Sequence, residues 1–161
     1  MASPSSAKAR RTAARLAAVQ ALYQLDMGEG PSRKAVYDLM QLRQDDIPEA
    51  LVEPDETLLK SISEGVPNRL GDIDGLLTSA LSQSRSLSRG EIVLRAVLRA
   101  GTYELLTDGE TAPGIIINDY VNVAHAFFTD NEPAKVNGVL NAVAQALGRG
   151  REASAVGGSK A

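Results

Sequence analysis

Residues 90–106, with the sequence GEIVLRAVLRAGTYELL, form the most apolar helix-length stretch of this 161-residue chain. Ser88 and Glu91 stand at the spacing of a capping box, which marks the start of a helix. Gly101 lies in the middle of this helix and costs about 1 kcal/mol relative to alanine, so we expect another helix to approach closely there. The apolar residues recur at helical spacing and leave little polar face, which predicts a central position in the fold: Val93, Leu94, Val97, Leu98, Leu105 and Leu106.

The same periodicity predicts further helices on both sides of this stretch. Residues 115–117, Ile-Ile-Ile, resemble a strand in isolation, but the residues after them keep the helical period. No other segment makes a convincing strand, so we predict an all-α fold with about seven helices. The other six are expected near residues 8–27, 32–44, 54–70, 71–81, 113–128 and 132–147.

The length corresponds to one domain or to two very small ones packed together. Residues 1–7 are small and polar, and we expect them to be a disordered lead-in. Residues 149–161 are rich in glycine, serine and arginine and carry no core-forming side chains, so we expect a disordered tail. The folded domain is therefore predicted to span residues 8–148.

Several classes of function are disfavoured by residues that the chain lacks. There is no cysteine, which excludes disulfides, thiolate catalysis and cysteine-based zinc sites. His125 is the only histidine, and its place on a helix favours a packed or half-exposed structural role. No carboxylate pair stands beside a nucleophile or base, and no apolar run approaches the length of a membrane span. We expect neither an enzyme nor a cofactor, a metal or a membrane segment.

The charge distribution is uneven. The chain has a net charge of −3, but residues 1–25 carry +4 and no acid, which leaves −7 on the remainder. On a helix, Lys8, Arg11 and Arg15 lie within about 60° of each other, away from the apolar stripe. Cations near a helix N-terminus oppose the macrodipole, so we expect them to serve an anionic partner, and guanidinium groups suit RNA phosphates. A solvated, frayed terminus and a transit peptide are the alternatives.

Three stretches resemble one family. ARRTAARLAAVQALYQLD (residues 9–26) resembles the opening helix of the NusB family of bacterial transcription antitermination factors. LRAVLRAGTYELL (residues 94–106) resembles the central helix of that family, and VNGVLNAVA (residues 136–144) resembles its last helix. The three occur in the family's order and spacing, and the likeness covers roughly residues 8–148.

The resemblance implies an all-helical fold of two small helical bundles packed side by side. It also implies a cytoplasmic protein without catalytic activity or cofactor. Family members bind the boxA element of ribosomal RNA leader transcripts together with the ribosomal protein NusE, and they act on RNA polymerase with other Nus factors. Carried onto this chain, the RNA-binding residues are Lys8, Arg10, Arg11, Arg15, Gln20, Tyr23, Lys135 and Asn137. The residues expected to meet NusE are Glu91, Leu94 and Arg95.

Some of these positions depart from the family pattern or have a second interpretation. Lys135 replaces an aromatic residue that would stack on a base, so we expect affinity to depend more on phosphates and on salt. Tyr23 also lies on the apolar stripe and is equally well explained as a core residue. Asn137 has donors for RNA or for its own backbone, and Gly138 is best explained by close helix packing. Leu94 occupies a position that is acidic in relatives.

Two other functions remain open. The NusB-like domain of certain ribosomal RNA cytosine methyltransferases shares this fold, but the chain ends before a methyltransferase domain would begin. A helical module that binds only protein, with its basic start merely solvated, would also fit the composition. The sequence leaves open whether the free protein is a monomer or a homodimer.

Overall fold

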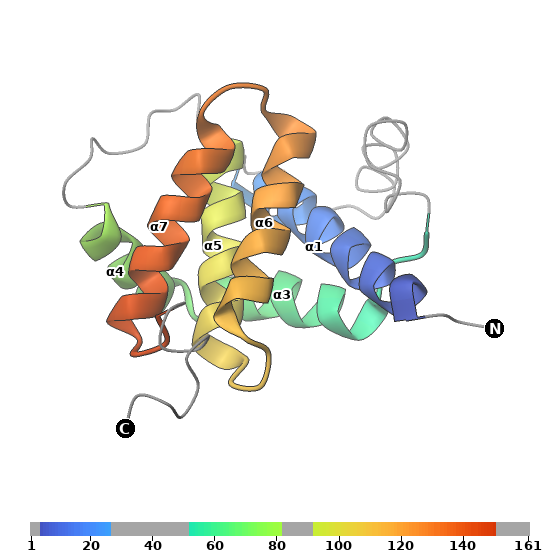
Figure 1. The fold of residues 1–161 in the computed structure, drawn as a ribbon, viewed down its shortest axis with the longest axis horizontal. Coiled ribbons are helices and arrows are strands. Elements are labelled where there is room, and N and C mark those ends of the chain that lie inside the picture. Colours follow the sequence, from blue (N-terminus) through green and yellow to red (C-terminus); the bar gives the residue numbers. More distant parts are fainter. Residues whose placement is uncertain (1–3, 27–51, 82–91, 151–161) are drawn as a thin grey trace. The chain divides into compact units, whose positions relative to one another are not determined.

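The structure, a computed structural model, describes residues 4–26, 52–81 and 92–150. These residues form helices and no strand, which confirms the all-α prediction (Figure 1). The helix expected near residues 32–44 and the capping box at residues 88–91 lie outside the described residues. The chain divides into two compact units, Met1–Asn68 and Arg69–Ala161. The described helices are α1 (Pro4–Asp26), α3 (Glu56–Asn68), α4 (Leu70–Ala80), α5 (Ile92–Thr107), α6 (Pro113–Phe127) and α7 (Glu132–Ala146).

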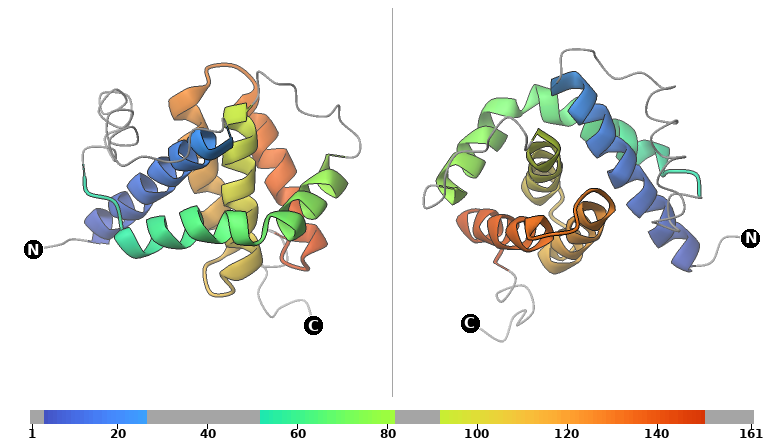
Figure 2. Two further views of the ribbon diagram at one scale, coloured as in Figure 1. Left: turned by 180° about the vertical axis from the view of Figure 1, so that it is seen from behind. Right: turned by 90° about the horizontal axis from the view of Figure 1, so that it is seen from above.

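In the first unit, α1 packs against α3, and the N-terminal part of α1 lies beside the start of α3 (Figure 2). Helix α1 begins at Pro4, one turn earlier than predicted. Proline is favoured at the first helical position because that residue's N–H has no intrahelical partner. From Thr12 to Leu22 every residue of α1 is buried. Most of these residues are alanine, valine or leucine, so this part of α1 is largely apolar on all sides, and Thr12, Arg15 and Gln20 are buried with them.

The start of α3 agrees with the sequence. The Asp55 Oδ1 atom accepts a hydrogen bond from the Leu58 amide at 3.1 Å, as expected of a residue that caps a helix N-terminus. Ile62 and Val66 are the buried residues of α3. The helix ends at Asn68, directly after Pro67, and α4 begins at Leu70. The helix thus stops two residues before the predicted end, one residue after a proline that weakens its last turn.

In the second unit, α5, α6 and α7 pack against one another, and α4 packs on α5 and α7 (Figure 1). Gly101 is the point of closest approach on α5, because a Cβ atom built there would lie 2.7 Å from Leu140 Cδ1 of α7. The same atom would lie 3.4 Å from Tyr120 Cδ2 of α6. The expected close packing at Gly101 is therefore confirmed.

Polar contacts join these helices within the second unit. The Tyr120 hydroxyl of α6 donates a 2.5 Å hydrogen bond to Glu104 Oε2 of α5, and both residues are buried. Arg99 of α5 donates to both carboxylate oxygens of Asp74 on α4, at 3.0 and 2.9 Å. A bidentate guanidinium–carboxylate pair restricts rotation as well as distance, so it fixes α4 against α5.

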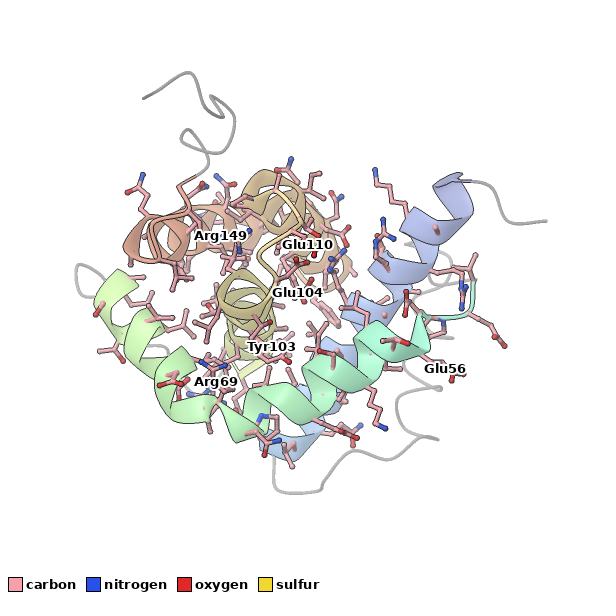
Figure 3. The ribbon with its side chains drawn as sticks, turned by 90° about the horizontal axis from the view of Figure 1, so that it is seen from below. Glu56, Arg69, Tyr103, Glu104, Glu110 and Arg149 are labelled. Atoms are coloured by element: carbon pink, nitrogen blue, oxygen red, sulfur yellow. The ribbon has the colours of Figure 1, made fainter. Side chains whose placement is uncertain are left out.

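Arg149, which the sequence assigned to the tail, is held by the folded unit. Its Nη1 atom donates to the Leu105 carbonyl at 2.6 Å, and its Nη2 atom donates to the Thr111 carbonyl at 2.8 Å. Gly148 has a φ of 74°, a left-handed conformation that turns the chain at the end of α7. Arg149 therefore ties the end of α7 to the end of α5 and to the following loop (Figure 3).

Candidate nucleic-acid interface

The first turns of α1 present an exposed cationic surface. Lys8, Arg10 and Arg11 are exposed, and no acidic residue stands in the first turn of the helix. Because α1 begins at Pro4, these cations follow its first turn, where the effect of the macrodipole has fallen off. The unfavourable interaction of these cations with the helix macrodipole is therefore small, and it no longer indicates an anionic partner. The exposure of the three side chains indicates such a partner instead.

Arg15 does not share this exposure. It is 5% exposed, because it lies in the buried part of α1. The cationic stripe expected from the helical spacing therefore ends at Arg11 on the surface. Burial of the neighbouring alanines and leucines sets this limit, which helical angles alone did not reveal.

Arg10 is connected to the segment that precedes α3. Its Nε atom donates a 3.3 Å hydrogen bond to the carbonyl of Glu53. Its own carbonyl accepts a 2.9 Å hydrogen bond from the amide of Asp55. The contact between residues 10 and 53 uses a backbone oxygen, so no residue type at position 53 could have indicated it.

Two further candidates lie toward the end of α1. Gln20 is 2% exposed, and neither its Oε1 nor its Nε2 has a hydrogen-bond partner among the described residues. Tyr23 is half-buried, so the structure is compatible with both interpretations of that residue. A buried amide without a partner costs free energy, which makes Gln20 the least satisfied of the candidate residues.

The candidates on α7 belong to the second unit. Lys135 is exposed and Asn137 is half-buried. The Asn141 Nδ2 atom donates to the Asn137 carbonyl at 2.8 Å and approaches Asn137 Oδ1 at 3.4 Å. These contacts use the acceptor atoms of Asn137, and they turn its amide oxygen toward the next turn of the helix.

Gly138 does not serve helix packing, and that prediction is wrong. It is exposed, and a Cβ atom built there would meet no atom within 4 Å. Position 138 falls on the outer face of α7, whereas the buried residues Val136, Val139 and Leu140 form the inner face. Of the two mid-helix glycines considered in the sequence, only Gly101 has a packing reason.

The residues expected to meet a protein partner do not form one exposed surface among the described residues. Leu94 is fully buried in the second unit, so in this structure it has no surface to offer. Arg95 is half-buried and already takes part in an interaction within the chain. Glu91 lies outside the described residues. The apolar periodicity predicts a core position for Leu94, and the resemblance predicts a partner contact. The structure agrees with the first of these two predictions.

His125 is exposed on α6 rather than packed. Within residues 4–26, 52–81 and 92–150, no group of acidic and histidine side chains is arranged to hold a metal ion. No helix in this described part of the chain is both long and apolar enough to cross a membrane.

Comparisons with known proteins agree on one family. Residues 12–145 match the model of the NusB family. The chain is 40% identical over 144 residues to the transcription antitermination protein NusB of Rhizobium rhizogenes, covering 88% of this chain and 90% of that protein. It is 42% identical over 139 residues to the transcription antitermination protein NusB of Novosphingobium aromaticivorans, covering 84% and 93%.

A solved structure has the same fold. A chain in the "Crystal Structure of a Plectonemic RNA Supercoil" matches with a TM-score of 0.63 and 22% sequence identity. The match covers 86% of the present chain and 96% of that one. At this identity the likeness concerns the fold.

Proposed function

Because this chain belongs to the NusB family, it is a transcription antitermination factor and not an enzyme, and we propose that it binds boxA-type RNA of ribosomal RNA leader transcripts. In this proposal it does so together with the ribosomal protein NusE. The pair then acts on RNA polymerase with other Nus factors to suppress premature termination.

The observation that carries the RNA part is the exposed cationic surface of α1, formed by Lys8, Arg10 and Arg11. A chain of net charge −3 repels RNA on average. A local group of three exposed cations still offers phosphate contacts, because charges beyond about 8 Å are largely screened at physiological salt. Arginine adds planar, bidentate donors that suit phosphate oxygens.

The exposed part of α7 supports a second set of contacts. Lys135 supplies an exposed charge, and Asn137 supplies a half-buried amide. Single-stranded RNA is usually recognised through splayed bases as well as phosphates. In this proposal α1 contributes most of the affinity, and the residues near the start of α7 contribute to base preference.

The acidic remainder of the chain supports a basic protein partner. Outside residues 1–25 the net charge is −7, and complementary charge accelerates association and favours the correct partner. Because Leu94 is buried, contacts near the start of α5 would have to come from half-buried neighbours such as Arg95, which already takes part in an interaction within the chain.

The test measures fluorescence anisotropy of a labelled boxA-like RNA and of a scrambled RNA, with the protein alone and with purified NusE. We expect NusE to strengthen binding and boxA to be preferred. A variant with Lys8, Arg10 and Arg11 changed to alanine should bind at least about tenfold more weakly, and its salt dependence should fall by about two in log–log slope. Arg15 stays unchanged, because a buried residue would confound the result.

Lys60→Ala is the matched control, since Lys60 is an exposed cation on α3 of the same unit. It should leave the affinity unchanged within about twofold, because Lys60 lies outside the proposed contact surface of α1. Equal affinity for boxA and scrambled RNA, with and without NusE, would contradict the proposal. That result would favour a helical module that binds only protein.

A further inference from the structure

Arg10 differs from the other exposed cations of α1 in its contacts. Its guanidinium donates through Nε to the Glu53 carbonyl, and its backbone carbonyl accepts from the Asp55 amide. The side chains of Lys8 and Arg11 have no comparable hydrogen bond among the described residues. Among the described residues, one cation of this surface is thus held by a second segment of the chain, and the other two are not.

The way Arg10 is held leaves its phosphate-binding atoms available. A guanidinium carries five N–H donors, and the Glu53 contact uses the one on Nε. The two Nη atoms, with four N–H donors, form the terminal edge of the group. That edge matches two oxygens of one phosphate. Fixing Nε also fixes the plane of the group, so less side-chain entropy is lost when a ligand binds.

The Glu53 carbonyl is itself held in place. Pro54 follows it and has a fixed φ angle, and Asp55 then caps α3 through the amide of Leu58. Asp55 also accepts a 3.0 Å hydrogen bond from the Leu59 amide through its carbonyl. The segment that contacts Arg10 therefore has the rigidity of the first turn of α3.

We propose that residues 53–55 position Arg10 for a bidentate contact with one RNA phosphate, so that Arg10 is the orienting cation of the α1 surface, whereas Lys8 and Arg11 add charge without such positioning. This inference rests on the proposed RNA binding and adds to it a role for a segment that carries two acids. The contribution of Glu53 comes from its backbone oxygen, and its carboxylate is not required.

A matched pair of substitutions tests the orientation. Arg10→Lys keeps the charge but loses both the Nε contact and the bidentate edge, so affinity for boxA-like RNA should fall by about fivefold or more. Arg11→Lys keeps the charge at an exposed position without such a contact among the described residues, and should weaken binding by about twofold or less. Equal effects of the two changes would overturn the proposal.

A double-mutant cycle tests the positioning segment. Pro54→Gly should weaken RNA binding about threefold in the wild-type background, and by less than about 1.5-fold when Arg10 is already alanine, since interacting residues are not additive. The log–log salt slope should also fall for Pro54→Gly, because one phosphate contact is lost. A contact that only holds α1 to α3 would lower the melting temperature and leave this slope unchanged. The same loss in both backgrounds would overturn the proposal.

Glu53→Gln is the control for the backbone role. It keeps the carbonyl and removes a negative charge near the RNA, so affinity should stay equal or rise slightly. A loss of affinity in this variant would show that the carboxylate is used and would contradict the inference. The Arg10→Lys and Arg11→Lys pair remains decisive if Pro54→Gly folds poorly. If the wild-type protein itself does not bind RNA, the proposed function fails first, and the two failures are thus distinguishable.

Discussion

Two buried polar side chains, Glu104 on α5 and Gln20 on α1, are treated differently by the fold. Glu104 on α5 is 3% exposed and receives the hydroxyl hydrogen bond of Tyr120. Gln20 on α1 is 2% exposed, and its amide has no partner within the described residues. A paired buried group favours one packing arrangement, whereas an unpaired one costs free energy. Buried polar groups without a partner are tolerated mainly at functional sites, which supports a functional role for Gln20 on α1.

The arginines show the same contrast. In the second unit, Arg99 pairs with Asp74, and Arg149 donates to two backbone carbonyls. In the first unit, Arg10 and Arg11 are exposed, and only the Nε of Arg10 is used within the described residues. Arg99 and Arg149 thus stabilise the helices of the second unit, whereas Arg10 and Arg11 keep donors that a ligand could use.

The largest expected effect on stability comes from removing the hydrogen bond between Tyr120 and Glu104. Tyr120→Phe removes the hydroxyl and leaves the Glu104 carboxylate buried without that donor, which should lower the free energy of unfolding by about 2–3 kcal/mol. In a Glu104→Gln background the same change should cost about half as much, because the acceptor is then uncharged. Urea denaturation of the four proteins measures both values. A loss below about 1 kcal/mol for Tyr120→Phe would show that the pair is not important for stability.

Replacement of the unpaired Gln20 should change the free energy of unfolding in the opposite direction. Gln20→Met has a similar volume and removes two unsatisfied polar atoms, so it should raise the free energy of unfolding by about 1–2 kcal/mol. Gln24→Met on the same helix, where Gln24 is half-buried, should change it by less than about 0.5 kcal/mol. If Gln20 serves RNA binding, the stabilised protein will bind boxA-like RNA more weakly. Destabilisation by Gln20→Met would mean that the Gln20 amide has a partner, and it would contradict the contrast with Glu104.

A pair of glycines compares the inside and the outside of the second unit. Gly138→Ala should stabilise the protein by about 0.5–1 kcal/mol through helix propensity, since the new Cβ meets nothing. Gly101→Ala should destabilise it by about 1 kcal/mol, because overpacking against buried Leu140 exceeds the gain in propensity. Thermal unfolding of both variants gives the two signs. Equal signs would show that the contact at Gly101 relaxes easily.

Much of the fold could be predicted because its helices repeat apolar residues with a clear period. The expected start of the helix near residue 113 agrees with α6, which begins at Pro113. The end of α3 was predicted two residues too late, because apolar Leu70 continues the period although it belongs to α4. Contacts at a distance, such as Arg149 with the end of α5, have no local signal.

The candidate interface could be predicted only in part. Residue types and spacing identified the cations of α1, but the burial of Arg15 depends on how densely the alanines around it pack. Gly138 and Gly101 are indistinguishable as mid-helix glycines, and only the structure shows which one faces a neighbour. The link between Arg10 and the Glu53 carbonyl joins positions 43 residues apart through a backbone atom, so side-chain identity carries no information about it.

The smallest expected effect concerns pH and the loop after α5. Burial raises the pKa of Asp108, but hydrogen bonds from Thr111 and Glu110 and the charge of Arg149 lower it below its usual value of 3.8 overall. A group with a lowered folded-state pKa stabilises the protein above its unfolded-state pKa, and this contribution is lost as the pH falls through the folded-state value. Asp108→Asn should therefore reduce stability at pH 7 by about 0.5 kcal/mol or less, because the group is largely solvated. Urea denaturation should show a smaller loss between pH 7 and pH 3 for this variant than for the wild type, and RNA affinity at pH 7 should not change. Identical pH profiles would mean that the Arg149 contacts hold this loop without help from Asp108.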